Sequence, residues 1–189
     1  MRFVVGLGNP GERYRRTRHN VGFMAVDVLL ARAGAHARQQ GEALVGRARL
    51  ADQEALLVKP LTFMNRAGAA VDQLLSGHGG RAADVVVVVD DVALELGRLR
   101  VRARGSHGGH NGLRSIIETL GSEDFPRVRI GVKRGELPDE LADYVLDVFP
   151  SEDVLVVQEL VARAADAVES LIRDGTAATM NRFNAPPAP

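Results

Sequence analysis

The fold is decided by the stretch Arg2-Phe-Val-Val-Gly-Leu-Gly-Asn-Pro-Gly11. Its apolar part, within 2–7, predicts a strand, and its glycines predict a tight turn after that strand. The stretch Thr17-Arg-His-Asn-Val-Gly-Phe-Met24 comes next, and we expect a helix that begins beside Asn20, whose side chain can cap it. His19 is therefore predicted at the carboxyl end of a strand and at the start of a helix. Open α/β sheets collect their ligands at that edge, and a helix start favours anionic groups.

The glycine spacing Gly6-x-Gly8-x-x-Gly11 also matches the fingerprint of dinucleotide-binding folds. That fingerprint requires the third glycine to open an apolar helix, with an acidic residue about 20 residues further on. Here Pro10 interrupts the turn, and Glu12-Arg-Tyr-Arg-Arg16 has no apolar helical face. A nicotinamide or flavin oxidoreductase is therefore a weak rival interpretation, and no cofactor is expected.

Composition and length limit the class of protein. The chain has 189 residues, of which 46% are hydrophobic, and this fits one domain over residues 1–184 with a loose Pro/Ala tail over 185–189. Cysteine is absent, which excludes disulfides, thiol nucleophiles and cysteine-ligated metals. We see no transmembrane run and no signal-peptide layout at the start, so we expect a cytoplasmic protein with no membrane partner.

Periodicity predicts strands that alternate with helices, which indicates an α/β fold. The strands are expected over 2–7, 43–50, 54–59, 84–90, 97–104 and 127–132. The helices are expected over 21–33, 65–76, 112–120 and 152–174. Asn111 is predicted to cap the third helix, and Gly175 to end the last one. The hairpin-like spacing of 43–59 makes the predicted sheet mixed.

Arginines are unevenly placed although the formal net charge is zero. Arg98, Arg100, Arg102 and Arg104 alternate with less polar residues, so a strand would carry all four on one face, roughly 6.6 Å apart. Two interpretations stay open: a solvated strand face, or a surface for a phosphate-rich ligand such as nucleic acid. Further arginines flank the expected site: Arg13, Arg15, Arg16, Arg18, Arg127, Arg129 and Arg134.

Asparagines and histidines recur where predicted strands meet helices. Asn9 lies in the first turn, Asn65 ends Lys59-Pro-Leu-Thr-Phe-Met-Asn65, and His107-Gly-Gly-His-Asn-Gly112 precedes the third helix. Simpler explanations exist for each, because turn asparagines often bond their own backbone, Asn65 and Asn111 fit helix caps, and a lone histidine is usually a surface or packing residue. The two histidines of the last motif have no carboxylate at metal-ligand spacing, so no metal site is predicted.

Asp90 and Asp91 end the run Val85-Val-Val-Val-Val89, which is typical of a buried central strand. A carboxylate at that place could hold the Nδ1–H of a histidine, and a histidine–aspartate pair suits general-base catalysis. Neither a Gly-x-Ser-x-Gly elbow nor a cysteine is present, so water is the simplest nucleophile.

These motifs together resemble the bacterial peptidyl-tRNA hydrolase family. The matching stretches occur in the same order over residues 1 to about 184, and they are Gly6–Gly11, Tyr14 with Thr17–Phe23, Lys59–Asn65, Gly108–Leu113, Phe125–Gly131 and Asn181–Phe183. The resemblance implies a single α/β domain, a twisted mixed β-sheet surrounded by α-helices, that acts as a monomer. It also implies hydrolysis of the ester between peptide and tRNA in ribosome-free peptidyl-tRNA.

The resemblance implies a role for each matching site residue. His19 resembles the catalytic base, Asp90 its carboxylate partner, and Asn9 the residue that distinguishes a peptidyl from a free aminoacyl group. The implied substrate contacts are Tyr14, Phe63, Asn65 and Asn111, with Met64 in the peptide groove and Arg102 and Arg129 clamping a tRNA phosphate. A water activated by His19 would attack the ester, and an asparagine amide, from Asn65 or Asn111, would stabilise the oxyanion.

The chain departs from the family pattern at three places. Val92-Ala93 follows the acidic pair where the family usually has Leu-Asp, Arg66-Ala67 stands in place of a common serine, and Gly131-Val-Lys-Arg134 is unusually basic. The main alternative is a non-catalytic RNA-binding relative with the same fold. The presence of His19, Asp90 and Asn9 together favours the enzyme.

Overall fold

Parallel strands form the centre of the sheet, in the order β4 (Gln53–Pro60), β1 (Arg2–Gly6), β5 (Val85–Glu95) and β7 (Arg127–Lys133). Their long apolar runs reflect burial on both faces. The computed structural model describes residues 1–185, and over these residues the sheet has seven strands. Antiparallel strands complete both edges: β3 (Ala43–Leu50) and β2 (Arg38–Gln40) beside β4, and β6 (Leu99–Arg102) beside β7.

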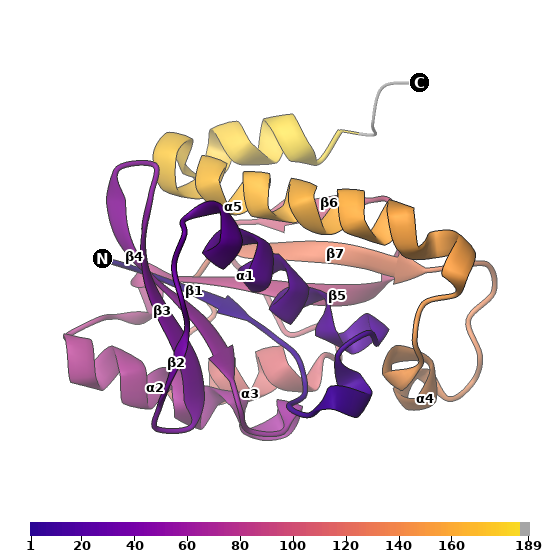
Figure 1. Cartoon of the computed structure of the whole chain (residues 1–189), viewed down its shortest axis with the longest axis horizontal. Coiled ribbons are helices and arrows are strands. Elements are labelled where there is room, and N and C mark those ends of the chain that lie inside the picture. Colours follow the sequence, from indigo (N-terminus) through magenta and orange to yellow (C-terminus); the bar gives the residue numbers. More distant parts are fainter. Residues whose placement is uncertain (186–189) are drawn as a thin grey trace.

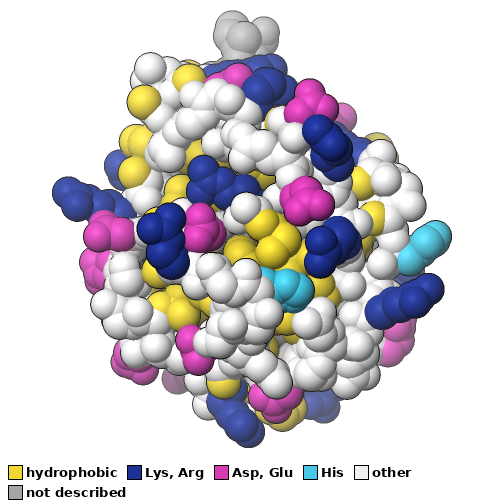
Figure 2. Space-filling model, turned by 90° about the vertical axis from the view of Figure 1, so that its left-hand side faces the viewer, with side chains coloured by type: hydrophobic (Ala, Val, Ile, Leu, Met, Phe, Trp, Pro, Cys, Tyr) yellow, Lys and Arg dark blue, Asp and Glu magenta, His cyan; other side chains and the backbone are white. Residues whose placement is uncertain are grey.

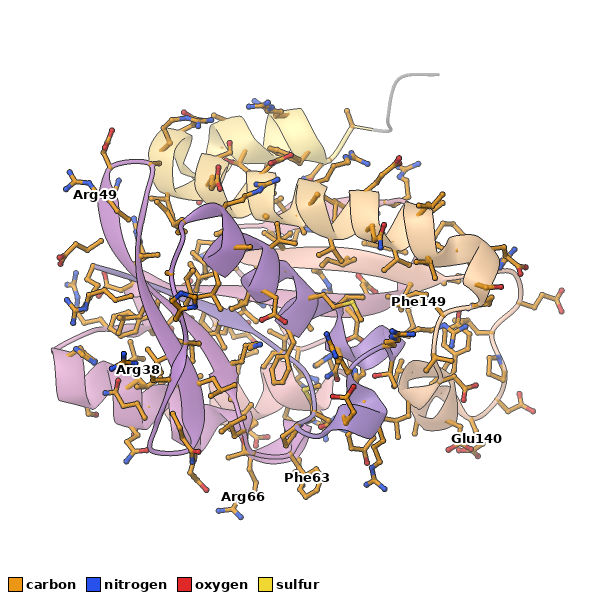
Figure 3. The ribbon with its side chains drawn as sticks, viewed as in Figure 1. Arg38, Arg49, Phe63, Arg66, Glu140 and Phe149 are labelled. Atoms are coloured by element: carbon orange, nitrogen blue, oxygen red, sulfur yellow. The ribbon has the colours of Figure 1, made fainter. Side chains whose placement is uncertain are left out.

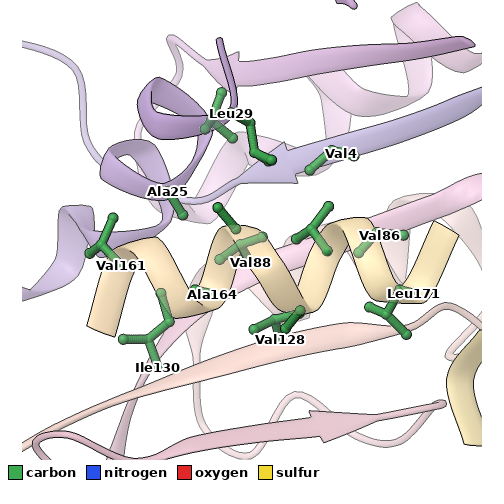
Figure 4. Close-up of a cluster of buried hydrophobic side chains, with 14 of the residues drawn as sticks. Val4, Ala25, Leu29, Val86, Val88, Val128, Ile130, Val161, Ala164 and Leu171 are labelled. Atoms are coloured by element: carbon green, nitrogen blue, oxygen red, sulfur yellow. The ribbon is translucent and has the colours of Figure 1, made fainter. Parts of the chain in front are cut away.

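Helices cover both faces of this sheet (Figure 1). The helices α1 (Val21–Arg32) and α5 (Val154–Phe183) pack on one face, and α2 (Ala67–His78) and α3 (Asn111–Leu120) pack on the other. Figure 4 shows α5 lying across the valines and isoleucine of the first face. The short helix α4 (Leu141–Leu146) lies beyond the carboxyl ends of the strands, where it can border a site instead of the core.

Two glycines allow α1 to approach the sheet unusually closely. A Cβ atom on Gly22 would lie 2.4 Å from the carbonyl oxygen of Val88 and 2.5 Å from the amide nitrogen of Leu7. A Cβ atom on Gly6 would lie 2.2 Å from the carbonyl oxygen of Gly22. These glycines therefore serve the contact between helix and sheet. The same contact brings the start of α1, and His19 just before it, to the carboxyl ends of β1 and β5.

The predicted α/β class and mixed sheet are confirmed, with differences at several boundaries. The strand expected over 84–90 continues to Glu95, whereas the strand expected over 97–104 is limited to Leu99–Arg102. The last helix does not end at Gly175: the backbone there has φ +80°, which breaks the helical geometry, and the helix then continues to Phe183. The elements β2 and α4 were not predicted, because one is short and polar and the other is a six-residue helix with no fully buried residue.

The end of the molecule opposite α4 carries basic and acidic side chains interspersed around a small apolar area (Figure 2).

Among the described residues, no helix combines the length and the apolar composition that crossing a membrane requires. The domain boundary at 184 stays a prediction. Of the predicted tail, Ala185 is exposed and residues 186–189 lie outside the described part.

Replacing Gly22 by alanine is expected to lower the free energy of unfolding by about 1–3 kcal/mol, because the added methyl group has no room against the backbone of Leu7 and Val88. Chemical denaturation measures this change. Gly77→Ala in α2 is the matched control: no atom lies within 4 Å of the added Cβ, so its stability should be equal or higher, by up to about 1 kcal/mol. A Gly22→Ala protein as stable as the wild type would contradict the close approach.

Candidate active site

A cleft of about 510 Å³ lies at the carboxyl ends of the central strands, beside α4. It gathers residues from the loops that follow β1, β4 and β6, from the strands β5 and β7, and from α4. The predicted site residues in its lining are Asn9, Tyr14, His19, Phe63, Met64, Asn65, Asp90, Asn111 and Arg129. Arg102 is not among the lining residues.

The centre of the cleft is a contact between His19 and Asp90. The His19 Nδ1 atom lies 2.9 Å from both carboxylate oxygens of Asp90. The Asp90 side chain is only 2% exposed, and that of His19 is 12% exposed. Burial by itself raises the pKa of Asp90, but His110 and His19 outweigh it and hold this pKa well below its ordinary value. Asp90 is therefore an ionised acceptor, and His19 donates its Nδ1–H to it.

His110 is a second donor to the same carboxylate, which sequence reasoning did not assign to the site. Its Nε2 lies 2.9 Å from Asp90 Oδ1, and the His19 and His110 rings lie 4.9 Å apart. The Nδ1 atom of His110 accepts from the backbone N–H groups of Gly112 and Leu113, so His110 is the cap of α3. Because Nδ1 accepts, Nε2 must carry the proton that His110 donates to Asp90.

His19, Asp90 and His110 also have ligand atoms within 4.8 Å of one another, as a metal site would. A metal at His110 would need the lone pair of Nε2. The backbone donors at Nδ1 keep the proton on Nε2, and that tautomer has no lone pair there. The cluster therefore fits a hydrogen-bonded network better than a metal centre.

Asn9 is held in a fixed orientation by its neighbours. Its backbone N–H donates to Asn20 Oδ1 at 2.9 Å, and its carbonyl accepts from Asn20 Nδ2 at 2.9 Å. The Asn9 Oδ1 atom accepts the backbone N–H of Met64 at 3.2 Å. Only the amide –NH₂ group of Asn9 is then left to face a ligand. The prediction that the Asn20 side chain caps α1 is wrong, because that side chain bonds the Asn9 backbone instead.

The other two predicted asparagines have free side-chain amides. Within residues 1–185, neither Asn65 nor Asn111 forms a side-chain hydrogen bond, and both border the cleft. The predicted cap at Asn111 is wrong, because His110 caps α3, and Asn65 is not the N-cap of α2, which is Arg66. Asn111 is the first residue of α3, where the helix dipole adds positive potential.

The remaining walls of the cleft are mostly apolar. Phe63 is 59% exposed and projects away from the ribbon (Figure 3), and Met64 is buried beside it. On the other side, α4 presents Leu141 and Leu146, which are 41% and 38% exposed. Such half-exposed apolar side chains around a polar centre suit a chain-like ligand of mixed side chains.

Arg18 fixes α4 to the loop that carries His19. Its side chain is buried, donates to the carbonyl of Tyr144 at 3.1 Å, and lies 4.2 Å from the centre of the Tyr144 ring. Its backbone N–H donates to the carbonyl of Asp147. Arg18 lies beside the site as expected, and there it holds α4 against the loop that carries His19.

Arg129 and Arg127, which were also expected to flank the site, both form contacts within the protein. The Arg129 Nε atom forms an ion pair with Asp91 at 2.9 Å, and the Arg129 side chain is 19% exposed. Arg127 is buried, and its guanidinium donates to the carbonyls of Gly105, Glu123 and Phe125. Burial lowers the pKa of Arg127 to about 10, so it remains a cation at neutral pH. Arg127 holds the loop before α3 and is not available to an anion.

A larger cavity, of about 630 Å³, lies on the other side of the Asn9 turn, between α1 and α5. It borders Asn9 and Asn20 but contains neither His19 nor Asp90. We place the chemistry in the smaller cleft, because that one holds the only buried carboxylate bonded by two histidines among the described residues.

Comparison with known proteins agrees with this geometry. The sequence profile of the peptidyl-tRNA hydrolase family matches residues 3–189. Peptidyl-tRNA hydrolase of Alkaliphilus oremlandii is 44% identical over 97% of this chain and 100% of its own length. The Chloroflexus aggregans enzyme of the same name is 46% identical over 97% of this chain and 99% of its own. The crystal structure of peptidyl-tRNA hydrolase from Acinetobacter baumannii has a TM-score of 0.90 at 30% identity, covering 98% of this chain and 95% of that one.

Proposed function

The chain belongs to the peptidyl-tRNA hydrolase family of carboxylic ester hydrolases, and we propose that His19 activates the water that cleaves the peptidyl-tRNA ester. The proposal includes release of free tRNA from ribosome-free peptidyl-tRNA by a cytoplasmic, monomeric enzyme. The observation that carries it is the bond from His19 Nδ1 to the buried Asp90 carboxylate.

That bond selects the reactive form of His19. Because Nδ1 carries the proton, the other ring nitrogen, Nε2, has a free lone pair. Nε2 can then accept a proton from water as the oxygen attacks the ester carbonyl. Asp90 stabilises the imidazolium that forms, in the manner of the aspartate in serine hydrolases. The proton then passes to the departing ribose oxygen, which is a better leaving group than an amine.

His110 acts in this scheme as a positioning residue. It donates to Asp90 and does not reach the reacting water through a free nitrogen, since Nδ1 is used by the start of α3. Its bond fixes the carboxylate and helps to keep it ionised. Asp90 therefore stays oriented toward His19 without gaining a proton of its own.

The asparagines supply donors for the substrate. The free amides of Asn65 and Asn111 are the candidates for stabilising the negative oxygen of the tetrahedral intermediate. The free –NH₂ group of Asn9 is the candidate donor to the carbonyl of the blocked amino group, which a free aminoacyl-tRNA lacks. Tyr14, Phe63 and Met64 then contact the esterified residue and the peptide.

The variant His19→Ala should lose hydrolysis by about 10²–10⁴-fold, because the general base is removed. Binding of uncharged tRNA should stay unchanged, since His19 has no core role. Release of peptide from N-blocked aminoacyl-tRNA measures the rate. Residual activity above about a tenth of wild type would contradict the assignment of His19 as the general base.

Comparing Asp90→Asn with Asp91→Asn tests which of the two neighbouring aspartates serves His19. Asp90→Asn should lower kcat less than His19→Ala does, because the base remains but loses its orientation. Asp91→Asn should change KM for tRNA substrates instead of kcat, because Asp91 forms an ion pair with Arg129. A silent Asp90→Asn together with a large loss of kcat in Asp91→Asn would show that the other aspartate serves the base.

The variant Asn9→Asp is expected to narrow the preference for N-blocked over free aminoacyl-tRNA. The aspartate keeps the acceptor for Met64 N–H but lacks the –NH₂ donor, and its charge attracts the free ammonium group. The ratio of kcat/KM for the two substrates is the measurement. Asn65→Asp is the control, and it should lower both values together. An unchanged ratio in Asn9→Asp would place the selectivity elsewhere.

A further inference from the structure

We propose that Arg18 is a positioning residue that couples the helix α4 to the base His19, so that a peptide seated against α4 raises kcat as well as affinity. The proposal rests on the proposed function for the identity of the base and of the ligand. It gives α4 a part in the reaction beyond that of a wall of the cleft.

The helix α4 is held in place by few contacts. It has no fully buried residue, and Leu141, Val145 and Leu146 line the cleft instead of packing into the core. Segments with little buried apolar surface have low local stability. The position of α4 therefore depends on the contacts that Tyr144, which does not line the cleft, makes with neighbouring elements.

The guanidinium group of Arg18 is buried among groups of the α4 segment. It lies 4.2 Å from the centre of the Tyr144 ring and 5.4 Å from the centre of the Phe149 ring, in the segment that leads from α4 to α5 (Figure 3). It also donates to the Tyr144 carbonyl at 3.1 Å. A buried cation is costly without such partners, and a planar guanidinium can meet ring faces and a carbonyl together. These contacts fix Arg18 and the end of α4 relative to each other.

The backbone joins the same two segments. The N–H of Arg18 donates to the Asp147 carbonyl at 3.1 Å, and the residue before Arg18 forms an isolated antiparallel bridge with Val148. His19 is the next residue of the same 3₁₀ turn. Because the peptide unit between them is rigid, a displacement of Arg18 moves His19 relative to Asp90.

The side chain of Tyr144 extends the connection to the sheet. Its hydroxyl donates to the Val132 carbonyl at 2.8 Å and accepts the backbone N–H of Arg134 at 3.0 Å. Val132 belongs to β7, which pairs with β5, the strand that carries Asp90. Tyr144 therefore links the strands that position the carboxylate to Arg18, and through Arg18 to the base.

A peptide can use this connection to orient the base. An apolar side chain that packs on Leu141 and Leu146 stabilises α4 in the position that holds Arg18, and with it the contact of His19 with Asp90. Binding energy from a part of the substrate that does not react is then spent on orientation at the reacting centre, and such energy appears in kcat. A peptide without apolar side chains gains less from α4.

Two substrates that differ only away from the ester test the coupling. They are acetyl-Leu-Leu-Gly and acetyl-Gly-Gly-Gly esters of the same tRNA, so the esterified residue is constant. The wild-type protein should hydrolyse the leucine substrate with a kcat at least about threefold higher. Arg18→Gln should bring the ratio of the two kcat values to about one. Leu141→Ala should lower kcat for the leucine substrate in the wild-type background and leave it unchanged in the Arg18→Gln background.

Two further variants keep the test independent of any loss of fold in Arg18→Gln. Tyr144→Phe removes only the hydroxyl and its bonds to Val132 and Arg134, and it should also lower the kcat ratio. Arg16→Gln is the control for charge, because it removes an exposed arginine two residues before Arg18, and it should leave the ratio unchanged.

The ring signals of the two histidines distinguish positioning from general damage. In ¹⁵N NMR spectra of Arg18→Gln, the neutral His19 ring should show a mixture of tautomers, whereas His110 should keep one. A wild-type kcat ratio in both Arg18→Gln and Tyr144→Phe, or an equal loss of kcat on both substrates, would overturn the coupling even with an inactive His19→Ala. Full activity of His19→Ala would instead overturn the base itself, so the two failures are distinguishable.

Discussion

The Asp90 carboxylate, buried at the end of β5 and bonded by His19 and His110, is the interaction on which the site depends. A buried charge is costly unless donors surround it, and here two imidazole N–H groups supply them. Each bond also sets the state of its donor. His19 is left with a lone pair toward the cleft, whereas His110 is left with a nitrogen that caps α3. In the proposed mechanism, this one carboxylate thus orients the base, His19, and is itself supported by His110.

The packing of the fold brings these groups together. Close contact at Gly6 and Gly22 places the start of α1 against β1 and β5, and His19 directly precedes that helix. The buried guanidinium of Arg127 holds the loop before α3, which carries His110. Under the proposed mechanism, stability and catalysis are coupled at both places, because a change in packing would move one histidine relative to Asp90.

Local sequence patterns predicted the site residues that lie where a predicted strand ends. Asp90 followed from the valine run before it, and His19 from its place between a strand and a helix. His110 was not assigned, because its role depends on the folding of an irregular loop back onto β5. The cap at Asn20 was predicted wrongly for a related reason: a tertiary partner, Asn9, competes with the helix for the same side chain. The resemblance to a family supplied the asparagine roles, which spacing alone did not.

The most direct test of this account is the protonation of the two imidazoles, measured by ¹⁵N NMR on the folded protein at a pH where both rings are neutral. We predict that His19 carries its proton on Nδ1 and has a free Nε2, and that His110 carries its proton on Nε2 with Nδ1 as a hydrogen-bond acceptor. A proton on Nε2 of His19, or on Nδ1 of His110, would contradict the proposed base and its support.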